Sequence, residues 1–160
     1  LLKTNEEILA NNKITISDIQ KDLYENNIKY AQSLIEAGEA KKAKSALEKS
    51  FQLDKKDSSV VEMLAIVCLE LEDYDNASNY CYDELQKNTN NYNMWNTIGV
   101  IAFKKQDYNF AATCFEMSLS INPYNYDSLY NLKDTYAELG NSSGRLECEQ
   151  KLKELKRPNN

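Results

Sequence analysis

The sequence predicts an all-α chain in which antiparallel helix pairs stack on one another as a helical solenoid. Three observations carry this prediction. The chain repeats with one fixed period, apolar residues recur at helical spacing within each repeat, and only four glycines and two prolines occur among 160 residues. Glycine and proline interrupt helices, so their scarcity favours one continuous array with short connections.

The period follows directly from residue numbers. The segment DYDNASNYC at 73–81 reappears as DYNFAATCF at 107–115, so that Asp73 corresponds to Asp107. Several other columns keep the same step: Ala43, Ala77 and Ala111; Leu47, Cys81 and Phe115; Val61, Trp95 and Leu129; Leu64, Ile98 and Leu132. Several independent columns that share one period indicate a structural repeat.

Within the third unit, the apolar spacing predicts two helices. The first covers 94–105 and the second covers about 110–119, with a turn at Gln106 and Asp107 and an end at Pro123. Small residues at Gly99 and Ala111 allow two helices to approach closely.

At this point the chain resembles the tetratricopeptide-repeat family, whose pattern is W-x2-L-G-x2-Y, then A-x3-F, then P over about 34 residues. The third unit carries this pattern as Trp95, Ile98, Gly99, Ala102, Ala111, Phe115 and Pro123. The resemblance covers about residues 24–140. It implies a right-handed superhelical solenoid of about three to four units, with stacked first helices that line a concave groove.

The other units match less fully. The unit at 58–91 has Thr89 in place of the proline, and the unit at 24–57 has Asn27 in place of the tryptophan. The fourth unit departs, because Lys133 and Arg145 occupy its small-residue columns. We therefore expect a capping helix over about 145–157. The expected organisation is an N-terminal helical segment at 1–23, an array at 24–140 (units 24–57, 58–91, 92–125 and 126–140 onward), and a capping helix with a frayed tail at 141–160.

Two capping-box signatures predict where the N-terminal helices begin. Thr4 with Glu7 predicts a short helix near 5–11, and Ser17 with Gln20 predicts a long helix from about 18 to 37. The chain begins with Leu1 rather than methionine, which favours a processed product or an excised piece.

Charge and composition exclude several classes of function. A formal net charge of −6 lacks the basic stripe that nucleic-acid binding requires. No apolar stretch approaches the length of a membrane span, and no signal peptide is visible. Histidine is absent, and the four cysteines match no zinc spacing. We expect buried free thiols in a cytoplasmic protein, no cofactor or metal, and no enzymatic activity.

The family's register places the second, fifth, ninth and twelfth residues of each unit in the groove. The resulting candidate ligand-binding residues are Ile28, Gln32, Ile35, Glu62, Ile66, Leu69, Asn93, Asn96, Val100, Phe103, Tyr130 and Asp134, with Glu25, Ser59, Asp127 and Ala137 completing the register. This set contains no lysine or arginine. Family members that bind the acidic tails of chaperones use such cations, so we do not expect that ligand.

The composition of the groove favours an apolar or weakly basic peptide or protein segment. The function expected is a protein-interaction scaffold or adaptor. Three alternatives stay open: an accessory domain of a larger protein such as a glycosyltransferase or secretion factor, self-association into a homo-oligomer, and a groove filled by the chain's own packing.

Overall fold

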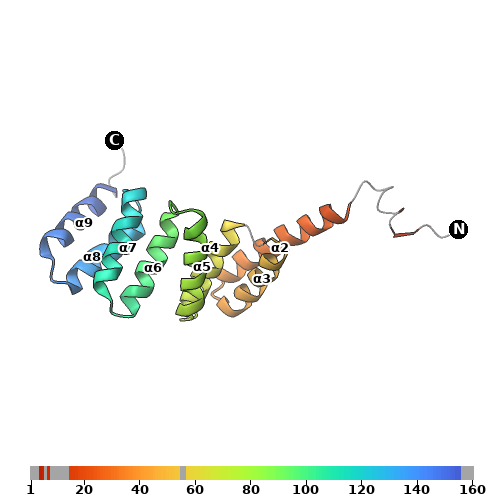
Figure 1. Ribbon diagram of the computed structural model, residues 1–160, viewed down its shortest axis with the longest axis horizontal. Helices are drawn as coiled ribbons and strands as arrows, with labels where there is room; N and C mark the ends of the chain where they lie inside the picture. Colours follow the sequence, from red (N-terminus) through yellow and green to blue (C-terminus); the bar gives the residue numbers. More distant parts are fainter. Residues whose placement is uncertain (1–3, 6, 8–14, 55–56, 156–160) are drawn as a thin grey trace. The chain divides into compact units, whose positions relative to one another are not determined.

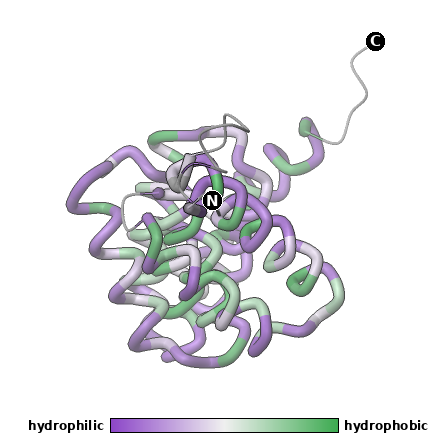
Figure 2. Tube along the Cα trace, turned by 90° about the vertical axis from the view of Figure 1, so that its right-hand side faces the viewer, coloured by the Kyte–Doolittle hydropathy of each residue, from purple (hydrophilic) through white to green (hydrophobic). Residues whose placement is uncertain are grey.

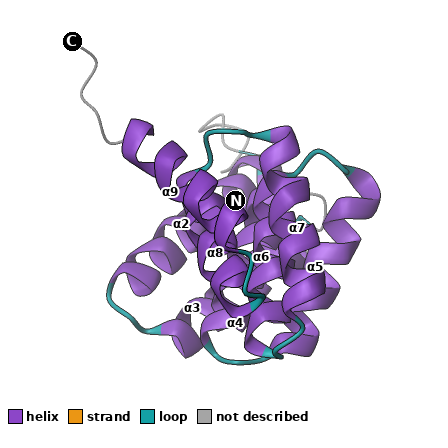
Figure 3. Cartoon of the chain, turned by 90° about the vertical axis from the view of Figure 1, so that its left-hand side faces the viewer, coloured by secondary structure: helices purple, strands orange, loops and turns teal. Residues whose placement is uncertain are grey.

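The computed structural model describes residues 4, 5, 7, 15–54 and 57–155, and those residues form only helices, turns and loops (Figure 3). The helices are α2 (Ile16–Glu36), α3 (Ala40–Leu53), α4 (Ser58–Glu70), α5 (Tyr74–Lys87), α6 (Tyr92–Lys104), α7 (Tyr108–Ile121), α8 (Tyr126–Glu138) and α9 (Ser142–Leu155) (Figure 1). The contacts divide the chain into unit 1, residues 1–60, and unit 2, residues 61–160.

The helices keep the period of the sequence. Helices α3, α5, α7 and α9 begin at residues 40, 74, 108 and 142, and helices α4, α6 and α8 begin at 58, 92 and 126. Consecutive helices pack together, as α2 does with α3, α6 with α7, α7 with α8, and α8 with α9. The all-α fold of repeated helix pairs is confirmed. Figure 2 shows hydrophobic and hydrophilic residues alternating along the helical turns, as expected when one side of each helix is buried.

The turn inside each helix pair has the same backbone conformation in all four pairs. Gly38, Glu72, Gln106 and Gly140 occupy the same position in successive repeats and have φ values of 73°, 58°, 63° and 67°. The two N–H groups at each turn bond back to the helix: Gln106 donates to the Phe103 carbonyl at 2.9 Å, and the next residue donates to the Ala102 carbonyl at 2.9 Å. This pair of bonds is a Schellman motif, which satisfies carbonyl groups that the helix end leaves unpaired.

The first described helix begins earlier than the sequence predicted. Thr15 caps α2: its hydroxyl accepts from the Asp18 N–H at 3.1 Å, and the Asp18 carboxylate accepts from the Thr15 N–H at 2.9 Å. The predicted cap at Ser17 is wrong because Thr15 forms this box, and a carboxylate in the first turn also suits the helix dipole. Thr4 and Glu7 do exchange the predicted pair of bonds. The rest of the helix expected at 5–11 lies outside the described residues.

The fourth unit contains a full helix pair. Helix α9 begins at Ser142, earlier than the start expected for a capping helix, and has the same length and register as α7. The small residue that allows α8 and α9 to approach is Gly144. A Cβ at that position would lie 2.7 Å from the Tyr136 ring. Gly144 thus supplies the small residue that is missing at Arg145, one position further along the chain. The boundaries of the predicted repeat units remain predictions.

Three apolar clusters form the core of unit 2. Phe115 is fully buried in the largest, and a Cβ on Gly99 would lie 2.5 Å from its ring. The predicted close approach of α6 and α7 at Gly99 is thus confirmed. The prediction of buried free thiols is also confirmed: all four cysteines, Cys68, Cys81, Cys114 and Cys148, are buried and unbridged. Among the described helices, none is both long enough and apolar enough to cross a membrane.

Candidate functional site

All twelve predicted groove residues reach solvent at least in part. Three of them, Ile28, Gln32 and Ile35, lie on α2 in unit 1. The other nine lie on α4, α6 and α8 in unit 2, and we call the surface that they form the first-helix face: Glu62, Ile66, Leu69, Asn93, Asn96, Val100, Phe103, Tyr130 and Asp134.

Glu62 joins α4 to the beginning of α6. Its two carboxylate oxygens accept from the side-chain amides of Asn91 at 2.7 Å and Asn93 at 3.3 Å. Asn91 also caps α6, because its side-chain oxygen accepts from the Met94 N–H at 3.3 Å. The carboxylate is therefore held in one position on the face.

Asn96 makes the corresponding connection between α6 and α8. Its side-chain oxygen accepts from the Ser128 hydroxyl and from the Asn131 amide, both at 3.1 Å. The Ser128 hydroxyl in turn lies 2.7 Å from the Ser118 hydroxyl on α7. Because both bonds use the oxygen of Asn96, the group that Asn96 can offer a ligand is its amide nitrogen, a donor.

A pocket of about 190 Å³ opens between α6 and α8. Three predicted residues, Val100, Phe103 and Asp134, line it, and Phe115, Lys104 and Asn131 complete the lining. The pocket thus has aliphatic and aromatic walls with a carboxylate, an amide and an ammonium group around them. A cavity of this size and lining suits an apolar side chain that lies beside polar backbone or a charged neighbour.

Tyr130 lies in a cluster of aromatic and charged groups on α8. The Lys133 ammonium is 3.9 Å from the centre of the Tyr130 ring and 3.0 Å from an Asp134 oxygen. Partial burial opposes the charge of Lys133, but its contact with Asp134 raises the pKa of Lys133 above the ordinary value. The Tyr126 ring stacks on the Tyr130 ring, with 6.4 Å between the ring centroids. The cation is therefore held against the ring and neutralised by its neighbouring carboxylate.

Two lysines lie beside the predicted residues of this face, although the predicted set itself contains none. Lys104 lines the pocket and Lys133 contacts two of the predicted residues. The sequence did indicate that Lys133 occupies an unusual position. It stands one period after Gly99, in the column where Phe115 fills the space beside a glycine, and its long side chain instead extends to the Tyr130 ring. The donors Asn91 and Ser128 were also missed, because their roles depend on the packing of neighbouring helices.

Part of the face also serves the core. Leu69 packs against the cluster of Cys68, Ala77 and Ile101, and Val100 and Phe103 pack against the cluster around Phe115. These three side chains are half-buried, whereas Ile66 is 42% exposed. Packing within the chain therefore accounts for a share of the apolar character, and Ile66, Tyr130 and the pocket form the accessible apolar part of this face. Within the described part of the chain, no cluster of three or more potential metal ligands occurs.

Comparison with known proteins adds to this geometry. Residues 92–125, the third helix pair, match the family model of the tetratricopeptide repeat. The third helix pair is therefore a tetratricopeptide repeat. A search of curated proteins finds no sequence match.

Solved structures of tetratricopeptide-repeat proteins share the fold over most of the chain. A crystal structure of MamA superposes with a TM-score of 0.72 at 16% identity, covering 94% of this chain and 83% of MamA. MamA from AMB-1 gives a TM-score of 0.63 at 18% identity, covering 84% of this chain and 73% of the other. PilF of Pseudomonas aeruginosa gives 0.75 at 17% identity, covering 88% of this chain and 64% of PilF. Likeness at this identity establishes the fold alone, a solenoid of stacked helix pairs.

Proposed function

We propose that this tetratricopeptide-repeat protein is an interaction scaffold whose first-helix face holds a segment of a partner protein. The observation that carries the proposal is the pocket of about 190 Å³ between α6 and α8, lined by Val100, Phe103 and Asp134. An accessible apolar pocket beside ordered amides suits an extended or helical peptide that inserts one side chain and bonds through its backbone.

The charge of the face favours a ligand with positive groups. Glu62 and Asp134 on the face and Asp127 in the same register contribute three carboxylates. Two lysines oppose them, Lys104 at the pocket and Lys133, which is already paired with Asp134. A ligand carboxylate entering here would lose water close to Glu62 and Asp134, whereas a lysine or arginine would be attracted by both. We therefore favour an aliphatic side chain next to a basic one as the recognised motif.

The test uses a random decapeptide library selected on the purified full chain, followed by titration of synthesised peptides. Selected sequences should pair an aliphatic residue with a lysine or arginine, and Val100→Arg should weaken their binding by at least about tenfold because the new cation occupies the pocket. Asp134→Lys should give a similar loss for peptides with basic residues.

Matched controls come from second helices of the same unit. Met117→Arg makes the same kind of change on α7, where Met117 is 41% exposed, and Asp83→Lys reverses an exposed charge on α5. Both should leave the affinities within about twofold, and circular dichroism should show that all four variants are folded. Equal weakening by the control and test variants, or a library consensus rich in acidic residues, would contradict the proposal.

The remaining expectations stay proposals. Four buried free thiols support a reducing, cytoplasmic setting, because exposed or paired cysteines are what oxidising compartments favour. The chain spans 64% of PilF, which leaves the role of an accessory domain in a larger protein open. Sedimentation at increasing concentration tests the third role, self-association.

A further inference from the structure

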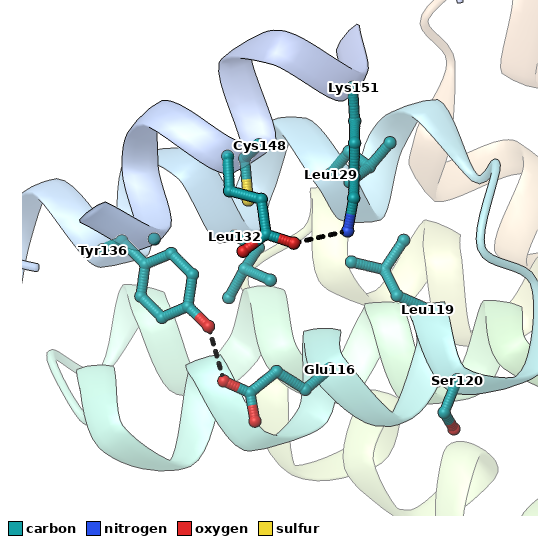
Figure 4. A pocket seen from close by; sticks show the side chains of 10 residues that line it. Glu116, Leu119, Ser120, Leu129, Leu132, Tyr136, Cys148 and Lys151 are labelled. Carbon is teal, nitrogen blue, oxygen red and sulfur yellow. Dashed lines mark hydrogen bonds and ion pairs between the residues drawn. The ribbon is translucent and has the colours of Figure 1, made fainter. Parts of the chain in front are cut away.

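A second hollow in unit 2 is lined by none of the predicted groove residues. It has a volume of about 290 Å³ between α7, α8 and α9, and Leu119, Leu129, Leu132 and Cys148 form its apolar surface (Figure 4). A neighbouring hollow of about 360 Å³ shares Leu129 and Lys151 with it. We call the two together the C-terminal groove.

The preceding repeat shows what normally fills this position. Moving back by one period turns Leu119, Leu132 and Cys148 into Leu85, Ile98 and Cys114. These three belong to one buried cluster, and the side chains of Tyr80 and Trp95 pack against that cluster. The residue equivalent to Trp95 in the fourth repeat is Leu129, which is smaller. The C-terminal groove thus lies where the fourth repeat has Leu129 in place of the indole side chain that Trp95 supplies in the third repeat.

The hydrogen bond that the Trp95 indole makes also has an equivalent position in the fourth repeat. The Trp95 ring N–H donates to the backbone carbonyl of Thr89 at 3.0 Å. The equivalent residue is Pro123, which lines the neighbouring hollow and, like every residue, has a carbonyl group. A tryptophan side chain entering from outside would therefore meet apolar walls and an acceptor in the arrangement that the third repeat provides for its own tryptophan.

The polar side chains around the groove add a charge preference. Glu116 accepts from the Tyr136 hydroxyl at 2.7 Å, and Lys151 pairs with Glu147 at 2.8 Å (Figure 4). With Glu154 in the neighbouring hollow, the groove has three carboxylates for one lysine. The excess of negative charge attracts basic residues beside the entering ring.

We infer that the C-terminal groove is a second docking site, which binds a partner segment presenting a tryptophan side chain next to basic residues. The site is independent of the first-helix face. A single tryptophan contact predicts a modest affinity, with a dissociation constant of about a millimolar for a short peptide. Longer partner segments would add contacts along α9.

The test titrates the isotopically labelled full chain with the blocked peptide Lys-Trp-Lys and follows backbone amide signals by NMR. Saturable shifts should centre on Ser120, Gly144 and Glu147, and Lys-Ala-Lys should bind at least about tenfold more weakly because it lacks the ring. Shifts centred on Val100 and Asn131 instead, or equal binding of both peptides, would overturn the inference.

Two variants and one control complete the design. Leu129→Trp restores the residue of the third repeat and should abolish binding by filling the groove, and Glu147→Arg should weaken Lys-Trp-Lys by about tenfold. Asp83→Arg on α5 makes a matched charge reversal and should change the affinity less than twofold. If Leu129→Trp does not fold, the comparison of Glu147→Arg with Asp83→Arg still decides. Concentration-dependent dimerisation that Leu129→Trp removes would assign the groove to a second copy of the chain and overturn the inference.

Discussion

Glu84 on α5 offers a sharp test of how this repeat array is stabilised. The residue is fully buried, and both of its carboxylate oxygens lack a hydrogen-bond partner among the described residues. The equivalent residue in the next repeat is Ser118, whose hydroxyl bonds to the Tyr92 carbonyl at 2.9 Å and lies against the Ser128 hydroxyl. The residue one period before Ser128 is Met94. Glu84 therefore has an apolar side chain in the position where Ser118 has a hydroxyl as its partner.

Replacing Glu84 with methionine should therefore stabilise the protein. A buried polar group without a partner costs about 1–3 kcal/mol, and more when ionised. Methionine keeps the length and the helix propensity of glutamate, so little packing or helical stability is lost. We expect the free energy of unfolding to rise by about 2 kcal/mol, which corresponds to an increase in Tm of about 4–8 °C for a chain of this size.

The assay is urea unfolding followed by circular dichroism, with Tm measured alongside. Glu84→Gln keeps two unpartnered polar atoms and should recover less than half of the gain, while Asp83→Met at the exposed neighbouring position should change stability by less than about 0.5 kcal/mol. A loss of about 1 kcal/mol or more in Glu84→Met would refute the reasoning, because it would mean that the carboxylate makes a favourable interaction in the folded protein.

Three further predictions concern other positions. Gly99→Ala should lower the free energy of unfolding by about 1–3 kcal/mol in urea titration, because its Cβ would lie 2.5 Å from the buried Phe115 ring; no loss would show that the ring can move aside. Gln106→Gly should raise Tm by a few degrees, about 1 kcal/mol, since φ of 63° is unstrained for glycine; a lower Tm would contradict this account of the turn. Burial raises the pKa of Cys81 to about 12 and of Cys114 to about 11, so that at pH 8 about one Cys114 thiol in a thousand is ionised; native protein should resist alkylation by iodoacetamide and react fully in urea, as mass spectrometry would show.

The fold was predictable because each repeat shows the same columns. Ala43, Ala77 and Ala111 alone locate three second helices, since a small residue is needed wherever two helices approach closely. The second helix of the fourth unit was harder to place. There the close contact moves by one residue to Gly144, and only the position of the Tyr136 ring shows that this glycine has taken over the role.

The candidate site was less predictable than the fold. The register of the family identified accessible positions, but which of them meet in a pocket depends on side-chain directions that a column pattern does not contain. Lys133 shows this clearly, because its side chain reaches the Tyr130 ring from a position that the pattern assigns to helix packing. The C-terminal groove exists because Leu129 stands where the preceding repeat has Trp95. The sequence shows this difference, but only the cluster against which Trp95 packs shows that a smaller residue leaves a hollow there.

The pairing of helices that follow one another in the chain has a consequence for how the protein folds. In unit 2 the helix packing joins α5 to α6, α6 to α7, α7 to α8 and α8 to α9, with one smaller contact between α6 and α8. Native contacts of this kind close only short loops, so the entropy lost before the first contacts form is small. Folding of unit 2 can therefore start at any well-packed pair and spread along the chain. Among the described helices α9 packs mainly against α8, so hydrogen exchange should begin in α9.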